Sequence, residues 1–207
     1  AWLSLRIAAV SATLATIFGT MIALALVRFG RFRGRTLLSG MATSPLVMPE
    51  VITGLSLLLL FVSLHKFIGW PAQRGFGTIT IAHTTFALAY VTVIVQSRLR
   101  AMDIALEEAA MDLGCKPLRI VFDITLPLIA PAMIAGWLLA FTLSLDDLVI
   151  ASFVSGPGGS TLPMLIFSKV KLGVTPDINA LATLIIVLVT AGVGLAWWLG
   201  RRGHATD

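Results

Sequence analysis

Charged residues are scarce in this chain of 207 residues, of which Asp, Glu, Lys and Arg make up 12% and hydrophobic residues 57%. A soluble globular domain carries about 25% charged and about 45–50% apolar residues. This chain has too few charged residues to cover a water-exposed surface, and its apolar residues form long runs. The composition therefore excludes an ordinary soluble domain and predicts an all-α, polytopic transmembrane helical protein.

Cysteine and histidine are almost absent as well. Cys115 is the single cysteine, so no internal disulfide is possible and export to an oxidising compartment gains no support. His65, His83 and His204 lie far apart without metal-ligand spacing, and we expect no metal site. The chain begins with Ala1 rather than Met and shows no short cleavable leader, so we expect it to start part-way into a longer protein.

Five apolar stretches approach or exceed the roughly 20 helical residues that cross a bilayer. They lie at approximately 5–27, 37–67, 78–95, 126–145 and 178–199. Pro45 and Pro49 divide the second stretch near its start. The first stretch has small residues four positions apart, at Ala8–Ala12 and Ala15–Gly19–Ala23, which allow a neighbouring helix to approach closely. We therefore expect five crossings.

Lys and Arg flank these stretches unevenly. If loop 28–35 lies inside the cell, ten basic residues fall on the inner side and five on the outer side. The inner set is Arg28, Arg31, Arg33, Arg35, Arg98, Arg100, Lys116, Arg119, Arg201 and Arg202, and the outer set is Arg6, Lys66, Arg74, Lys169 and Lys171. The positive-inside rule then predicts a cytoplasmic C-terminus. The net charge of +5 thus reflects orientation rather than nucleic-acid binding.

The segment between the third and fourth predicted spans carries a spaced motif. Glu108-Ala109-Ala110 is followed after three residues by Gly114, after nine more by Ile124, and then by Leu126-Pro127. Apolar residues at near-helical spacing before Gly114 predict a short helix stopped by glycine, and a second short helix then leads into the next span. A generic amphipathic loop is the alternative. The spacing resembles, in full, the EAA loop of ABC importer permeases.

This resemblance implies that the loop docks in a groove on a cytoplasmic ABC ATPase dimer and transmits its closure to the membrane helices. Carried over, Glu108, Ala109 and Gly114 would form the contact, with Glu107 and Asp112 as nearby solvated charges. The chain has no G-x-x-x-x-G-K-[ST] phosphate loop. We therefore expect no catalytic residue and no cofactor in this chain, with ATP and magnesium bound by the partner ATPase.

Further segments resemble the spermidine/putrescine permeases, and most of all putrescine permease subunits. They are Ser144 to Gly158, Thr161-Leu162-Pro163, Asn179 to Thr183 and Pro45 to Gly54. The resemblance covers nearly the whole chain. It implies a type I ABC importer permease fold, a second and homologous permease subunit, a periplasmic polyamine-binding protein, and the lipid of the bacterial inner membrane. One departure is that these permeases usually have six crossings, and the first is absent here.

The expected organisation is therefore a single transmembrane permease domain over residues 1–207. Its cytoplasmic coupling loop spans 97–125 and its outer loop 155–177. The outer loop opens with a turn-rich run from Ser155 to Ser160, and its centre, Leu162 to Val170, is apolar enough to enter the membrane interface.

A carboxylate at or inside a predicted span boundary has a high free-energy cost of desolvation. A carboxylate at such a position is therefore interpreted as functional unless a structural role is found. A polyamine is a flexible polycation, so its path needs carboxylates or aromatic faces, for which the candidates are Asp146, Asp147, Glu50 and Tyr90. Adjacent helical residues point about 100° apart. One Asp is thus expected to face the path, while the other pairs with backbone or a neighbouring subunit.

Each candidate also has a structural alternative. Asp147 in Ser144-x-x-Asp147 could cap a new helix after a break, and Glu50 after Pro49 suits the first turn of a helix. Tyr90 could serve interhelical packing. His83, another polar residue within a span, is more often an interhelical hydrogen bonder than a path residue.

Three other functions compete with polyamine import. A secondary carrier or channel would show inverted repeats with matched broken helices, and none is found. An intramembrane enzyme would need paired catalytic residues within the spans. An importer of sulfate or molybdate would favour Arg or helix N-termini at depth, whereas this chain places acids there. The sequence therefore favours the polyamine permease and leaves putrescine and spermidine both open.

Overall fold

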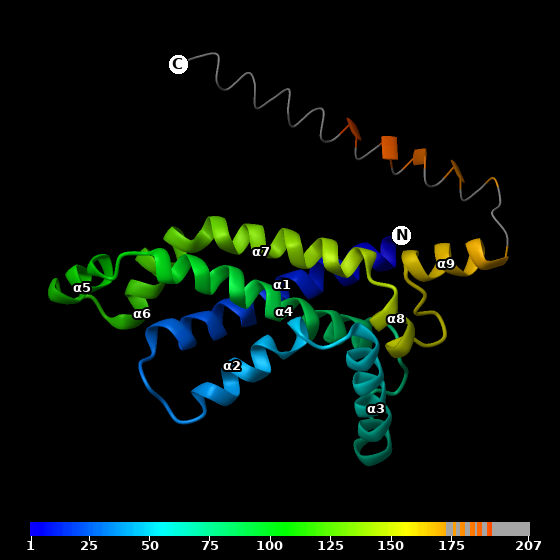
Figure 1. Ribbon diagram of the computed structural model, residues 1–207, viewed down its shortest axis with the longest axis horizontal. Coiled ribbons are helices and arrows are strands. Elements are labelled where there is room, and N and C mark those ends of the chain that lie inside the picture. Colours follow the sequence, from blue (N-terminus) through cyan, green and yellow to red (C-terminus); the bar gives the residue numbers. More distant parts are fainter. Residues whose placement is uncertain (173–175, 177–178, 181–182, 185, 188–189, 192–207) are drawn as a thin grey trace. The chain divides into compact units, whose positions relative to one another are not determined.

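The computed structural model describes residues 1–172, 176, 179–180, 183–184, 186–187 and 190–191. Every regular element in this part of the chain is a helix (Figure 1). The elements are α1 (Trp2–Arg28), α2 (Arg35–Thr43), η1 (Ser44–Leu46), α3 (Glu50–Ile68), α4 (Phe76–Ala101), α5 (Ala105–Asp112), α6 (Pro117–Ile120), the π-helical turn η2 (Val121–Thr125), α7 (Leu126–Asp146), α8 (Val149–Val154) and α9 (Leu162–Leu172). The all-α prediction is confirmed for these residues.

Four helical segments of the described part are long and apolar enough to cross a membrane: α1, α3, α4 and the continuous run Pro117–Asp146. They correspond to the first four predicted spans. The second is shorter than the apolar stretch 37–67, because its helix begins only at Glu50, after Pro49. The fifth predicted crossing, 178–199, lies largely outside the described residues.

The chain divides into two units, Ala1–Pro163 and Met164–Asp207. In the first unit α1, α4 and α7 lie side by side (Figure 1). Alanine and branched aliphatic side chains fill the core between them: Ala12, Ala15, Ala23, Ala87, Val91, Val95, Leu99, Ile129 and Ala140. In the second unit, the described residues 164–172 belong to α9, so the apolar centre of the predicted outer loop is helical.

Val91 of α4 shows how closely the three helices approach. A Cβ added to Gly19 of α1 would lie 3.0 Å from Val91 Cβ, and one added to Gly136 of α7 would lie 3.3 Å from Val91 Cγ1. The valine therefore sits between two glycines of different helices. The predicted role of the small residues in α1 is confirmed, since all five of them are buried.

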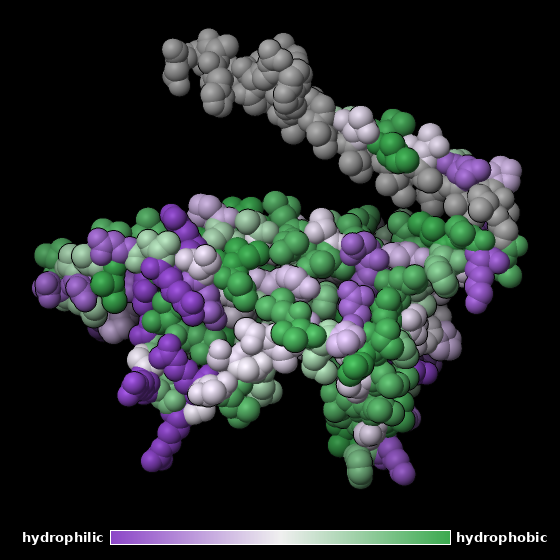
Figure 2. Space-filling model, viewed as in Figure 1, coloured by the Kyte–Doolittle hydropathy of each residue, from purple (hydrophilic) through white to green (hydrophobic). Residues whose placement is uncertain are grey.

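Hydrophobic and hydrophilic side chains separate along the first unit. Figure 2 shows hydrophobic residues over α7 and α3, and hydrophilic ones gathered at the end that carries α5 and the loop after α1. A broad apolar exterior of this kind suits contact with lipid or a partner rather than with water.

Two glycines, Gly54 and Gly156, allow close approaches at the opposite end. A Cβ added to Gly54 of α3 would lie 2.8 Å from the Phe153 ring, so α3 and α8 pack with almost no gap. The run from Gly156 to Gly159 forms a turn closed by the Gly159 N–H bond to Gly156 O at 2.9 Å. Gly156 lies against the Arg74 carbonyl, which an added Cβ would approach to 2.6 Å.

Candidate functional site

The segment between α4 and α7 forms the first candidate site, and its backbone explains its shape. Met102 is extended and ends α4, after which Asp103 Oδ1 accepts the Ala105 N–H at 3.0 Å and begins α5. Gly114 follows α5 with φ +83°, and the Cys115 N–H bonds back to Ala110 O at 3.0 Å. A left-handed glycine of this kind ends a helix at no steric cost. The predicted glycine stop is confirmed.

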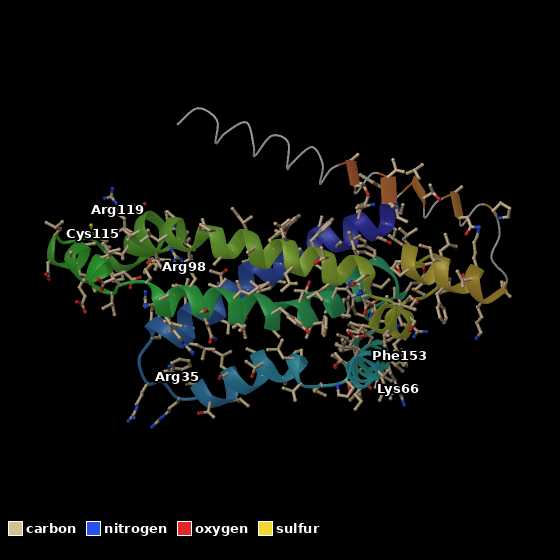
Figure 3. All side chains as sticks on the ribbon, turned by 45° about the horizontal axis from the view of Figure 1, so that its top comes forward. Arg35, Lys66, Arg98, Cys115, Arg119 and Phe153 are labelled. Atoms are coloured by element: carbon tan, nitrogen blue, oxygen red, sulfur yellow. The ribbon has the colours of Figure 1, made fainter. Side chains whose placement is uncertain are left out.

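The second short helix of the motif is also present. Pro117 occupies the first turn of α6, where its missing N–H costs nothing, and the π-helical turn η2 then leads into α7 at Leu126. Figure 3 places Cys115 and Arg119 at the same end of the unit as Arg35 and Arg98, with Lys66 and Phe153 at the other end. Three of the basic residues that the sequence assigns to the inner side, Arg35, Arg98 and Arg119, therefore lie at one end of the unit. Arg201 and Arg202 of the same set lie outside the described residues.

The faces of α5 differ sharply in exposure. Glu108, Ala109 and Asp112 are exposed, as is Gly114 beyond the helix, whereas Glu107 and Ala110 are buried. The interpretation of Glu107 as a solvated charge was wrong. It is turned toward α1 because it lies about 100° around the helix from Glu108.

Glu107 joins three elements. Its Oε2 lies 2.8 Å from Arg28 Nε at the end of α1, and their side chains are only 10% and 16% exposed. Its Oε1 accepts a hydrogen bond of 2.8 Å from Thr125 Oγ1 at the end of η2. Within the described part of the chain, the buried Arg28 Nη2 has no hydrogen-bond partner. The carboxylate is thus a shared acceptor for α1 and η2.

The end of α1 is held in a second way. Arg35 at the start of α2 donates from Nη2 to Leu26 O and from Nη1 to Gly30 O, both at 2.8 Å. These bonds satisfy a carbonyl that the last turn of α1 leaves without a helical partner. Arg28 is therefore presented to α5 from a fixed helix end.

The second candidate site lies at the break between α7 and α8. Asp147 is extended and leaves the helix, and its carboxylate accepts the Ile150 N–H at 3.2 Å and the Ala151 N–H at 2.7 Å. His83 Nε2 of α4 also donates to it at 3.0 Å, and Ser144 Oγ lies 2.6 Å from His83 Nδ1. The His83 and Asp147 side chains are 2% and 6% exposed. Asp147 therefore caps the first turn of α8, which is the structural alternative for this residue.

The other path candidates stand apart from this network. Asp146, the last residue of α7, and Glu50, the first of α3, are exposed, and Tyr90 is half-buried with its ring edge-on to Phe86 at 5.3 Å. No hydrogen bond connects these three residues to Asp147 within the described residues. Of the adjacent aspartates, only Asp146 thus keeps its charge uncommitted to the backbone.

Sequence reasoning missed both polar networks in part. Arg28 and Glu107 are 79 residues apart and His83 and Ser144 are 61 apart, so no local spacing pairs them. The available signal was the cost of each polar group in or beside an apolar span, which predicts that it has a partner without identifying it.

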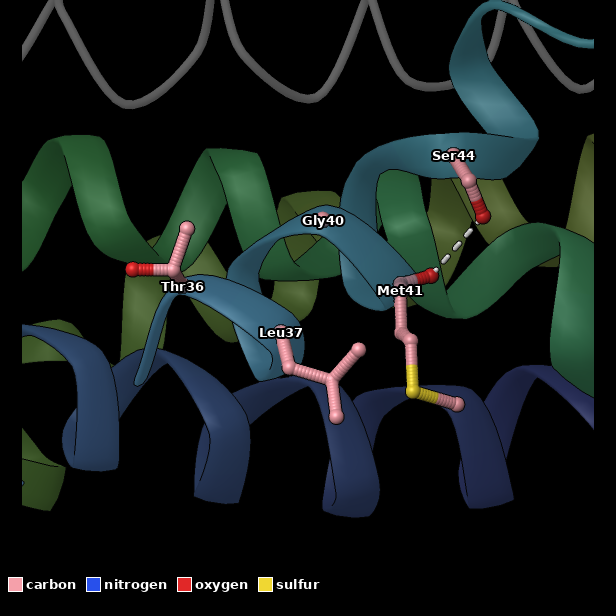
Figure 4. Close-up of a pocket in the computed structure, with 5 residues that line it drawn as sticks. All are labelled: Thr36, Leu37, Gly40, Met41 and Ser44. Atoms are coloured by element: carbon pink, nitrogen blue, oxygen red, sulfur yellow. Dashed lines mark hydrogen bonds between the residues drawn. The ribbon is translucent and has the colours of Figure 1, made fainter. Parts of the chain in front are cut away.

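The surface hollows offer little chemistry. The larger, of about 560 Å³, lies along α2 and is lined by Thr36, Leu37, Gly40, Met41 and Ser44 (Figure 4). Its lining has no titratable side chain, and the Ser44 hydroxyl is used in a bond to Met41 O at 3.1 Å. The smaller, of about 380 Å³, includes His65 and Arg74 at the opposite end of the unit. Neither brings together the groups of a catalytic centre.

Known proteins resemble this chain along nearly its whole length. Residues 15–202 match the family described as "Binding-protein-dependent transport system inner membrane component". The putrescine transport system permease protein PotI of Escherichia coli is 65% identical over 202 residues, which are 98% of this chain and 72% of that protein. The spermidine/putrescine transport system permease protein PotC of Haemophilus influenzae is 47% identical over 201 residues, 97% and 76% of the two chains.

Two solved transporters share the fold. The inward-facing methionine ABC transporter MetNI matches with a TM-score of 0.72 and 17% identity, covering 94% of this chain and 89% of that one. An amino acid ABC transporter solved with histidines matches with a TM-score of 0.61 and 20% identity, covering 96% and 90%. The expected ABC importer permease fold is confirmed. With its apolar spans and its complete EAA motif, the chain belongs to the family of binding-protein-dependent transport system inner membrane components, the multi-pass permease subunits of ABC transporters.

Proposed function

We propose that this permease subunit carries polyamines, putrescine or spermidine, into the cell and forms half of their translocation path. The observation that carries this assignment is the similarity along almost the entire chain to permeases of putrescine and of spermidine.

Asp146 is the residue that best suits a cationic solute. Its carboxylate is exposed at the end of a spanning helix, where contact with lipid would be costly. The side chain is therefore expected to face water, in the path or at the membrane surface, or a partner subunit. Asp147 is committed to α8 and His83, so it supports the position of Asp146 instead of meeting the solute. Glu50 and Tyr90 remain secondary candidates for the same path.

The exposed side of α5 is the proposed contact with a cytoplasmic ABC ATPase dimer. Glu108, Ala109, Asp112 and Gly114 supply its exposed groups. We infer that α5 and loop 28–35 lie on the cytoplasmic side, which the Arg residues labelled at that end support. The cytoplasmic C-terminus follows from the fifth predicted crossing, which lies largely outside the described residues. A second, homologous permease would complete the path, and a periplasmic polyamine-binding protein would deliver the solute from outside.

The test is uptake of radiolabelled putrescine and spermidine by cells that lack other polyamine carriers. Asp146→Asn keeps the shape but removes the charge. A charge-assisted hydrogen bond contributes about 1.5–3 kcal/mol and a neutral one about 1, so we expect roughly a tenfold loss of uptake. Asp123→Asn is the matched control, because Asp123 is also exposed but lies in the π-helical turn, paired with Arg119 at 3.0 Å.

Membrane abundance and association with the ATPase are measured for both variants. Wild-type uptake by Asp146→Asn at equal abundance would show that Asp146 does not meet the solute. Absence of uptake of both polyamines by the wild type, with another solute transported, would refute the polyamine assignment itself.

A further inference from the structure

We propose that Glu107 is the positioning residue that links the coupling helix α5 to the membrane helices, through Arg28 of α1 and Thr125 of η2. Glu108, its neighbour, faces outward from the same turn. Glu108 thus lies on the side of α5 that faces the ATPase, and Glu107 lies on the side that faces the membrane helices. This role rests on the proposed docking of α5 to the ATPase.

The covalent connections of α5 are poorly suited to pass on a displacement. On one side the extended Met102 interrupts the helix between α4 and α5. On the other side the chain passes through left-handed Gly114 and extended Lys116 before α6 begins. A short helix between two such joints can tilt without moving its neighbours. Noncovalent contacts must then carry its motion.

The carboxylate of Glu107 supplies such a contact at a single point. It receives Arg28 Nε at 2.8 Å and Thr125 Oγ1 at 2.8 Å, so α1 and the start of the fourth span are attached to the same two oxygen atoms. Burial strengthens both bonds, since water competes with neither. A displacement of α5 is thereby delivered to α1 and α7 together.

The ends that receive the displacement differ in stiffness. Arg28 is the last residue of α1, and Arg35 holds the last turn of that helix by a hydrogen bond. A force on Arg28 should therefore move α1 as a rigid body. Thr125 ends a π-helical turn, a local irregularity that is often found at functional sites. Arg28 Nη2 is buried and has no partner within the described residues, so this guanidinium has a donor nitrogen that it can use in another arrangement.

The experiment uses the complete importer, co-purified and reconstituted in vesicles. Glu107→Gln and Arg28→Gln each remove one charge of the pair, and the exchange Arg28→Glu with Glu107→Arg restores it in reverse. We expect both single variants to keep the ATPase bound and to hydrolyse ATP at the basal rate. Their polyamine-stimulated rate of hydrolysis should fall about tenfold, and the exchange variant should recover a substantial part of that rate. Arg119→Gln is the control, because it breaks a nearby ion pair that is exposed and contributes little.

A second measurement does not depend on the solute. Spin labels at Phe29→Cys and Leu106→Cys, in a Cys115→Ser background, report the distance between α1 and α5 with and without trapped nucleotide. The wild type should give a narrow distribution in both states, and Glu107→Gln a broadened one. If polyamines fail to stimulate ATP hydrolysis by the wild type, the polyamine assignment fails. The label distances still test whether Glu107 connects α5 to α1. The role of Glu107 would be overturned if the Glu107→Gln variant were stimulated as strongly as the wild type, or if its label distances stayed narrowly distributed. Loss of the bound ATPase from both single variants would overturn it as well.

Discussion

Replacement of Asp147 by alanine should destabilise the permease far more than the same change at Asp146. The Asp147 carboxylate accepts two backbone N–H bonds at the start of α8 and one from His83. Loss of a helix cap costs about 1 kcal/mol. Leaving a buried donor such as His83 Nε2 without a partner costs about 1–3 kcal/mol more. The expected total is about 2–4 kcal/mol.

For a chain of this length, 1 kcal/mol corresponds to roughly 2–4 °C in melting temperature, so the Asp147→Ala variant should melt about 4–16 °C below the wild type. Asp147→Asn should lose about half as much, because its amide oxygen still accepts one N–H. The assay is the fraction of detergent-purified permease that remains monodisperse after heating, compared with Asp146→Ala at matched concentration. Equal melting temperatures for Asp147→Ala and Asp146→Ala would refute the assignment of the cap and the His83 bond.

Two further predictions concern the ATPase contact and the orientation. Glu108→Lys, which reverses an exposed charge on α5, should leave the protein inserted but reduce substrate-stimulated ATP hydrolysis in reconstituted vesicles at least tenfold; full stimulation would remove α5 from the contact. Cysteines at Ala72 and Ser160 should react with an impermeant maleimide outside intact cells, and Arg33→Cys only after the membrane is opened. Labelling of Arg33→Cys from outside would reverse the orientation.

Element positions could be predicted wherever one residue type decides them. Runs of apolar residues locate α1 and α4, Pro49 sets the start of α3, and Gly114 ends the coupling helix. The third predicted crossing ends at about Val95, where the apolar run ends. The helix continues to Ala101, since Leu99 is fully buried in the core beside α1 and α7. Tertiary packing, not local hydropathy, determines that boundary.

Side-chain roles were less predictable than the elements. The sequence requires that one of two adjacent aspartates have a partner, but only the extended backbone at Asp147 determines which. In the same way, the exposed Glu108 follows from the motif, whereas the burial of Glu107 depends on Arg28, which lies far away in the sequence. A carboxylate beside an apolar span indicates that a hydrogen-bond or ion-pair partner exists. Only the three-dimensional structure shows which residue that partner is.

The position of Val91 between Gly19 and Gly136 has a consequence for how motion can be observed. Backbones this close leave no space for α1, α4 and α7 to slide past one another at that level. Labels placed in pairs within these three helices near Val91 should therefore report constant separations through a transport cycle and can serve as a fixed reference frame. Informative labels belong beyond the joints at Met102, Gly114 and Asp147, where the chain leaves its helices.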